Sequence, residues 1–195
     1  MPFTPFHMGP GLLVKAVAGR HFSILTFGIA QVAMDIEPLM GLMRGATVLH
    51  GPTHTYPAAC VIALLVAALS PRLCRPMLRR WNKELLFFRL PQLVETESFA
   101  PTPVIVGAFV GTLSHVLLDS MMHADITPLA PWSTANGLLD LISVRTLHLF
   151  CLLSGLFGVL GWLFVGWQRS PVSAGHEGSG YGCADAEFMD VRRRL

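Results

Sequence analysis

The sequence predicts an all-α integral membrane protein, a helical bundle with about four transmembrane helices, a short N-terminal helix and an amphipathic cytoplasmic segment. Its 195 residues are 52% hydrophobic and only 13% charged, and their mean hydropathy is +0.55. A soluble domain carries about 25% charged residues. The composition therefore favours a membrane protein over a soluble helical protein with an apolar core.

Four apolar stretches are long enough, or nearly long enough, to cross a bilayer, which takes roughly 17 to 25 helical residues. These stretches are residues 21–43, 57–73, 103–122 and 146–167. The last one is apolar around its whole circumference, which is typical of a membrane-spanning helix. We therefore expect four spans.

The N-terminal segment, residues 5–18, predicts a short helix, because Thr4 is a suitable N-cap and Pro5 fits the first helical position. This helix either enters the membrane from the outer side or lies along the cytoplasmic surface. The sequence leaves both arrangements open. Only the first would allow His7 to reach a site among the spans.

Residues 72–90 combine six Lys and Arg residues with Trp81 and two phenylalanines. This composition predicts an amphipathic helix on the membrane surface. No nucleic-acid-binding motif accompanies the basic residues, so nucleic acid is not an expected partner, whereas membrane lipid is. Residues 170–195, with Gly, Ser and a terminal basic run, predict a disordered cytoplasmic tail after a transmembrane domain at residues 1–169.

The distribution of basic residues predicts the orientation. Twelve of the 14 Lys and Arg residues lie before the first span, between the second and third, or after the fourth. Only Arg44 and Arg145 lie in the other connections. The positive-inside rule places the more basic side in the cytoplasm. We therefore expect a multi-pass protein of the cytoplasmic membrane whose C-terminus is cytoplasmic and whose segments 44–56 and 123–145 face out.

The most informative polar residues are His115 and Asp119, which stand four residues apart inside an apolar span. Residues at this spacing share one helix face, and His123 extends the series within a sector of about 80°. Ionisable groups are costly in hydrocarbon and mark functional sites. Imidazole and carboxylate suit a divalent metal, zinc first, with iron or manganese as alternatives. The competing interpretation is a polar seam that joins helices. Ser114 is expected to bond either His115 or its own helix backbone.

Asp35 and Glu37 interrupt the first span. Successive odd positions on a helix point about 200° apart, so the two carboxylates are expected to have different roles. We predict Asp35 as a metal ligand because it lies deeper in the apolar run. Glu37, next to Pro38, is predicted as a general base, and Asp125 in the second outer segment is the other candidate for that role.

His50 and His54 flank Gly51-Pro52, which predicts a turn, so these two candidate ligands are not expected on one continuous helix. Thr53 is predicted as the N-cap of the following helix. That position would place His54 at the positive end of the helix, which favours an anion such as a substrate phosphate.

These motifs resemble a known family. The run Met1-Pro2-Phe3-Thr4-Pro5-Phe6-His7, the turn His50-Gly51-Pro52-Thr53-His54 and the helix Ser114-His115-Val116-Leu117-Leu118-Asp119 resemble bacterial inner-membrane proteins classed as membrane-bound metal-dependent hydrolases. One branch of these proteins is LexA-regulated. The resemblance covers residues 1 to about 165 and implies hydrolytic activity at the bacterial inner membrane.

The order of the candidate ligands is also similar to that of zinc-dependent phospholipase C. The similarity involves His7, Asp35, one of His50 or His54, and the pair His115 and Asp119. It implies a cluster of metal ions. The chain has no His-x-x-x-Glu pair after these residues, so one or two metal ions are expected instead of three.

The expected function is metal-dependent hydrolysis of a lipid-linked or headgroup phosphoester at the outer face of the membrane. A bound metal lowers the pKa of a water molecule toward about 7 and polarises a phosphoryl oxygen. Two alternatives stay open: a non-enzymatic membrane protein with a structural metal or a polar helix seam, and a small ion- or proton-linked transporter. The sequence leaves the oligomeric state open, and also whether the protein is an enzyme.

Overall fold

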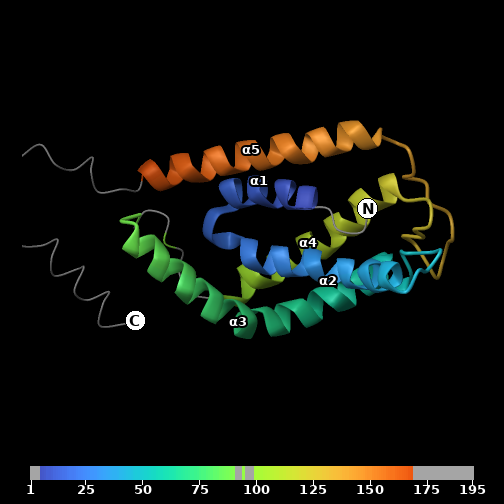
Figure 1. Ribbon diagram of the computed structural model, residues 1–195, viewed down its shortest axis with the longest axis horizontal. Coiled ribbons are helices and arrows are strands. Elements are labelled where there is room, and N and C mark those ends of the chain that lie inside the picture. The colour runs from blue at the N-terminus through green and yellow to red at the C-terminus, as the bar shows by residue number, and fades with distance from the viewer. Residues whose placement is uncertain (1–4, 91–93, 95–98, 169–195) are drawn as a thin grey trace, which may run out of the picture.

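The structure is a computed structural model in which residues 5–90, 94 and 99–168 are described. All regular structure within these residues is helical, which confirms the predicted all-α fold. The long helices are α1 (Met8–Ala18), α2 (Ile24–Met43), α3 (Tyr56–Phe87), α4 (Pro101–Met122) and α5 (Val144–Gln168) (Figure 1). Short 3-10 helices are present at Pro5–His7, Gly19–His21 and Pro52–His54. The predicted cap Thr4 and the predicted tail, residues 170–195, lie outside the described residues.

Four of these helices, α2 to α5, are long and apolar enough to cross a membrane. They correspond to the four predicted spans. The helices pack as two groups: α2, α3 and α4 pack on one another, and α1 lies along α5 (Figure 1). Small buried residues, Ala30, Ala63 and Ala108, lie where α2, α3 and α4 meet. Small side chains allow membrane helices to approach closely.

The close contact between α1 and α5 depends on glycines. A Cβ atom at Gly9 would collide with the carbonyl oxygen of Cys151, and one at Gly158 would collide with the backbone of Leu12. This packing is the one expected if residues 5–18 enter the membrane, and differs from that of a segment lying along its surface. The segment packs beside a span, and His7 at its start lies next to the end of α4.

The start of α3 corrects one prediction. Its N-cap is Thr55, whose side-chain oxygen accepts a hydrogen bond from the backbone N–H of Ala58 at 3.3 Å. The N-cap prediction for Thr53 was wrong, because the Thr53 hydroxyl donates to Glu37 instead. From this cap α3 continues without a break to Phe87. The basic segment that we expected as a separate surface helix is therefore the second half of a 32-residue helix.

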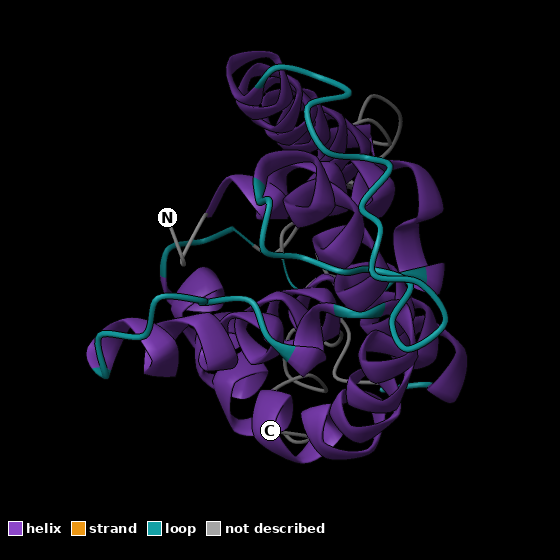
Figure 2. Cartoon of the chain, turned by 90° about the vertical axis from the view of Figure 1, so that its right-hand side faces the viewer, coloured by secondary structure: helices purple, strands orange, loops and turns teal. Residues whose placement is uncertain are grey.

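One end of the bundle gathers the polar residues. The start of α1, the end of α2, the start of α3, the end of α4 and the start of α5 all meet there. The two connections 44–55 and 123–143 cross this end, and Figure 2 views the molecule from that side. Lys15, Arg20 and the basic half of α3 lie at the opposite end.

Candidate metal centre

Side chains from four parts of the chain meet beneath these two connections. They come from the segment before α1, from α2, from the 44–55 connection, and from α4 and the residue that follows it. The side chains are His7, Asp35, His50, His54, His115, Asp119 and His123. All of them except His123 are buried. The structure thus brings together every ligand predicted from the sequence.

The carboxylate of Asp119 is the centre of this cluster. Its Oδ2 atom lies 3.1 Å from Nε2 of His115 and 3.6 Å from Nε2 of His54. The same oxygen lies 3.9 Å from Nε2 of His50, and Oδ1 lies 3.5 Å from Nε2 of His7. Two ligands of one tetrahedral zinc ion are about 3.4 Å apart. The observed separations therefore fit side chains that share a metal ion.

The orientation of His115 is set by Gln31 on α2. The Nδ1–H group of His115 donates to Oε1 of Gln31 at 2.7 Å, and the Gln31 amide nitrogen donates to the carbonyl of Gly111 at 3.1 Å. The proton of the neutral ring is therefore on Nδ1, and the lone pair on Nε2 faces Asp119. Ser114 donates to Gly111, so it bonds its own helix and not His115. Gln31 was not among the predicted site residues, although it lies four residues before Asp35 and hence on the same helix face.

His50 is oriented by Asp125. Its Nδ1–H group donates to Oδ1 of Asp125 at 2.9 Å, and the backbone N–H groups of Leu49 and His50 donate to Oδ2 at 3.1 Å. Partial burial opposes ionisation of Asp125, but the hydrogen bonds from His50 outweigh it and hold the carboxyl pKa at about 2. Asp125 is thus an ionised acceptor that directs Nε2 of His50 toward Asp119.

His54 is oriented through Thr53 and Glu37. The Nδ1 atom of His54 lies 3.1 Å from the Thr53 hydroxyl oxygen, and that hydroxyl donates to Oε2 of Glu37. The backbone N–H of Thr53 donates to the same carboxylate oxygen at 3.1 Å. A Cβ atom at Gly51 would collide with the carboxylate of Glu37, so a side chain there would displace the end of the Glu37 side chain. Glu37 thus supports the turn that presents His54.

Several ring nitrogens of the cluster have no hydrogen-bond partner among the described residues. They are Nε2 of His54, Nε2 of His115 and both ring nitrogens of His7, all of them buried. Protonation would give these rings a positive charge, but burial lowers the pKa of His7 to about 4 and that of His54 to about 3. Burial also lowers the pKa of His123. The ring nitrogens of His7 and His54 therefore face the Asp119 carboxylate as lone pairs, and a bound cation would satisfy both kinds of group.

Three sets of side chains bring their ligand atoms within 4.8 Å of one another. The sets are His7, His115 and Asp119; His50, His54 and Asp119; and His50, His123 and Asp125. The first two sets share Asp119, so the cluster can hold a metal ion at either of two adjacent positions. Asp35 lies outside these sets, with its Oδ1 atom 3.5 Å from Nε2 of His115.

A family model described as YdjM inner membrane protein matches residues 11–176. The chain belongs to this family. The matched range contains every residue of the cluster except His7. The family description gives a location and no reaction, and it agrees with the four apolar helices and with the predicted bacterial inner membrane. The comparisons with curated proteins and with solved structures found no match.

Not every histidine of this YdjM family member belongs to the cluster. The ring of His148 stacks against Phe6 with centroids 4.9 Å apart, and His21 lies exposed at the opposite end of the bundle. The described cysteines, Cys60, Cys74 and Cys151, contribute no ligand atom to the three sets. The donor set is therefore imidazole and carboxylate, which suits zinc, iron or manganese.

Proposed function

We propose that this chain is a metal-dependent hydrolase whose active centre is the cluster around Asp119. One observation carries the proposal: four imidazole Nε2 atoms converge on one buried carboxylate. A polar seam between helices would pair hydrogen-bond donors with acceptors. In this cluster acceptors face acceptors, and the Nδ1 donors of three rings are already used elsewhere. This pattern favours a metal centre over a seam.

We assign the ligands to two positions that share Asp119. His7 and His115 with Asp119 would hold one ion, and His50 and His54 with Asp119 would hold the other. Zinc suits these nitrogen and oxygen donors, and iron and manganese are the alternatives. When bound, such an ion supplies Lewis acidity and makes a water molecule more acidic.

The remaining carboxylates receive different roles. The hydrogen bonds of Glu37 and Asp125 favour orienting roles for both, in place of the proton-accepting role expected from the sequence. Such partners fix the tautomer and direction of a ligating ring. Asp35 has no such task among the bonds described, and one of its oxygens lies beside His115. We assign it as a further ligand.

We propose a phosphoester at the membrane surface as the substrate, a lipid-linked or headgroup phosphate ester. Two observations support this class. The cluster lies at one end of helices long enough to cross a membrane, so it lies near headgroup depth. That end carries few basic residues, and the positive-inside rule therefore supports the outer face of the inner membrane, with the C-terminus in the cytoplasm.

Metal content measured by elemental mass spectrometry on detergent-purified protein tests the centre. We expect stoichiometric zinc, iron or manganese in the wild-type chain and its loss in H115Q and D119N. The matched control is H21Q, a histidine at the opposite end, which should keep the metal. A folded wild-type chain that holds no metal, even after resupply, would contradict the proposal.

Hydrolysis of a phosphodiester dye and release of phospholipid headgroups test the reaction. We expect turnover that chelation abolishes and that the same metal restores. Metal loss in H115Q with intact folding and no turnover would agree with a catalytic centre. A wild-type chain that holds metal but cleaves neither substrate class would favour the structural alternative.

A further inference from the structure

The connection between α4 and α5, residues 123–143, exposes large apolar side chains at the end of the bundle where the metal centre lies. Trp132 is 79% exposed, Leu141 65% and Leu129 50%. The same segment contains no Lys or Arg, and its acidic residues are Asp125 and Asp140. Large apolar side chains exposed together on one segment are typical of a surface that meets a partner or a membrane.

Hydrogen bonds hold the inner side of this connection against the helices. The carbonyl of Pro128 accepts from the backbone N–H of Tyr56 at 2.9 Å, and the side chain of Asn136 donates to the carbonyl of Ser120 at 2.9 Å. Ile126, on the same segment, is buried. The connection is thus attached to the start of α3 and to the end of α4. These contacts determine which of its side chains face outward.

The membrane is the apolar surrounding nearest to the exposed side chains. The connection begins directly after α4 and leads directly into α5, and both helices are long and apolar enough to cross a membrane. The start of α5 exposes further large apolar residues, Leu149 and Phe150. The 22 residues of α4 span about 33 Å, which matches a hydrocarbon core about 30 Å thick. The connection therefore lies at headgroup depth, where tryptophan is enriched.

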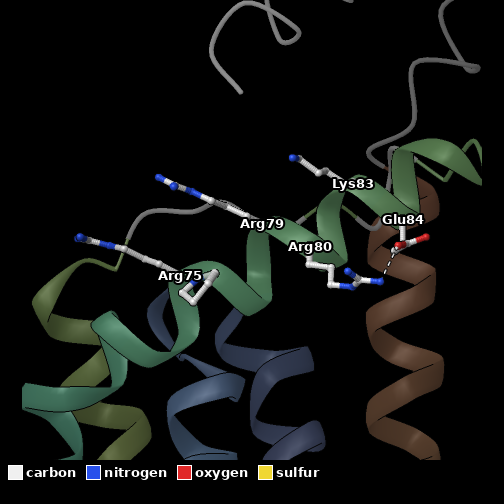
Figure 3. Close-up of a pocket in the computed structure, with 6 residues that line it drawn as sticks. Arg75, Arg79, Arg80, Lys83 and Glu84 are labelled. Atoms are coloured by element: carbon white, nitrogen blue, oxygen red, sulfur yellow. Dashed lines mark ion pairs between the residues drawn. The ribbon is translucent and has the colours of Figure 1, made fainter.

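The other end of the bundle exposes charge instead. Figure 3 shows Arg75 and Lys83 projecting from the basic half of α3, where Arg80 lies 3.8 Å from Glu84. The positive-inside rule assigns such an end to the cytoplasm. The 123–143 connection has no basic residue with which to contact headgroup phosphates. Its contact with a leaflet therefore has to be made by its aromatic and aliphatic side chains.

We propose that Trp132, Leu129 and Leu141 insert among the lipid headgroups of the outer leaflet and hold the 123–143 connection on the membrane surface. His123 and Asp125 stand at the start of this connection, which crosses the end of the bundle that contains the metal centre (Figure 2). A phosphoester carried by a lipid would then reach the centre from the plane of the membrane. This consequence for the substrate rests on the proposed hydrolase function, whereas the insertion itself does not.

Quenching of tryptophan fluorescence in lipid nanodiscs tests the insertion, because both membrane faces are accessible to a soluble quencher there. The difference between the wild type and W132F reports Trp132 alone. Bromine atoms near the headgroup should quench this difference signal more strongly than bromine atoms near the end of the acyl chain, and iodide in water should quench it weakly. Strong quenching by iodide without an effect of brominated lipid would overturn the proposal. Protection from both quenchers would also overturn it, since a second copy or another protein would then cover Trp132.

A pair of serine variants tests the consequence for the substrate. W132S removes an inserted side chain and keeps the backbone hydrogen bond from residue 132 to Leu129, and A135S changes another exposed residue of the same connection. W132S should raise the KM for phospholipid, varied as a mole fraction of the bilayer, by about ten-fold, the order expected for one large apolar side chain. Its kcat and its turnover of a water-soluble phosphodiester dye should not change, and A135S should match the wild type on both substrates. An unchanged KM for phospholipid in folded W132S would contradict delivery from the membrane plane.

The two tests separate this inference from the proposed function. A chain that has Trp132 at headgroup depth and hydrolyses neither substrate would retain the insertion and reject the hydrolase. A chain that turns over the soluble dye while iodide quenches Trp132 strongly would retain the hydrolase and reject the insertion.

Discussion

The hydrogen bond between Gln31 and His115 should strengthen metal binding, and removing it should weaken that binding. Q31M keeps the size of the side chain and removes the acceptor for the Nδ1–H group of His115. The neutral ring can then move its proton to Nε2, where it would bond Asp119 and compete with a metal ion. Loss of such an orienting partner weakens metal binding about 10- to 100-fold. That range corresponds to about 1.4 to 2.7 kcal/mol.

Two companion variants make the prediction specific. Q31E retains an acceptor at the same place and should bind zinc at least as tightly as the wild type. S114A removes a hydroxyl that bonds the backbone of its own helix, and its zinc affinity should change little. Zinc affinity is measured on metal-free protein by competition with a chromophoric chelator, and thermal melting confirms that each variant is folded. Unchanged affinity in folded Q31M would refute the reasoning.

Three further predictions follow from burial and close packing. The free energy of unfolding of the metal-free protein should fall by up to about 1.4 kcal/mol per pH unit per histidine as the pH drops from 6.5 toward 4. The reason is that the pKa of His7 is about 4 in the folded state, so between pH 6.5 and 4 only the unfolded state takes up the proton. In H7Q the melting temperature should therefore change less with pH than in the wild type. G51V should displace Glu37 and weaken zinc binding in the chelator assay, whereas G137V, which points into open space, should not. G158I would collide with the backbone of α1, so we expect a lower melting temperature, and an unchanged value would contradict the observed packing.

The ligands on α4 could be predicted because helix geometry alone places them. A spacing of four residues puts His115 and Asp119 on one face in any α-helix, whatever surrounds it. The spans were predictable for a similar reason, since the length of an apolar run has to match the bilayer. Predictions of this kind depend only on helix geometry and on the thickness of the bilayer, so residue spacing and the length of an apolar run are sufficient for them.

The partners that orient the ligands could not be derived in this way. His50 and His54 reach Asp119 only because a connection folds back over the bundle, and no spacing in the chain encodes that path. Gln31 carries no charge, so it does not stand out as a site residue in an apolar helix. A single amide side chain in such a helix more often forms a hydrogen bond to another helix than belongs to a functional site. Thr53 was a plausible cap until the tertiary structure brought Glu37 to it.

The end of α3 could not be predicted from the apolar pattern either, for a different reason. The apolar run ends near Leu73, and we placed the end of the span there. The helix continues because leucine, arginine, lysine and glutamate are all good helix formers, and they maintain the backbone conformation after the apolar pattern stops. The hydropathy of the sequence indicates where the membrane-spanning part of a helix ends, whereas helix propensity indicates where the helix itself ends.

The division of the ligands between two helix groups has a consequence for assembly. His7 belongs to the segment that packs with α5, whereas the other members of the first ligand set, His115 and Asp119, belong to α4. A metal ion shared by these side chains would cross-link the segment before α1 to a helix that is synthesised later. The centre would be completed only after α4 is inserted, and amide hydrogens of α1 would exchange faster whenever the metal is withdrawn. Metal supply would then determine when the bundle becomes a single cooperative unit.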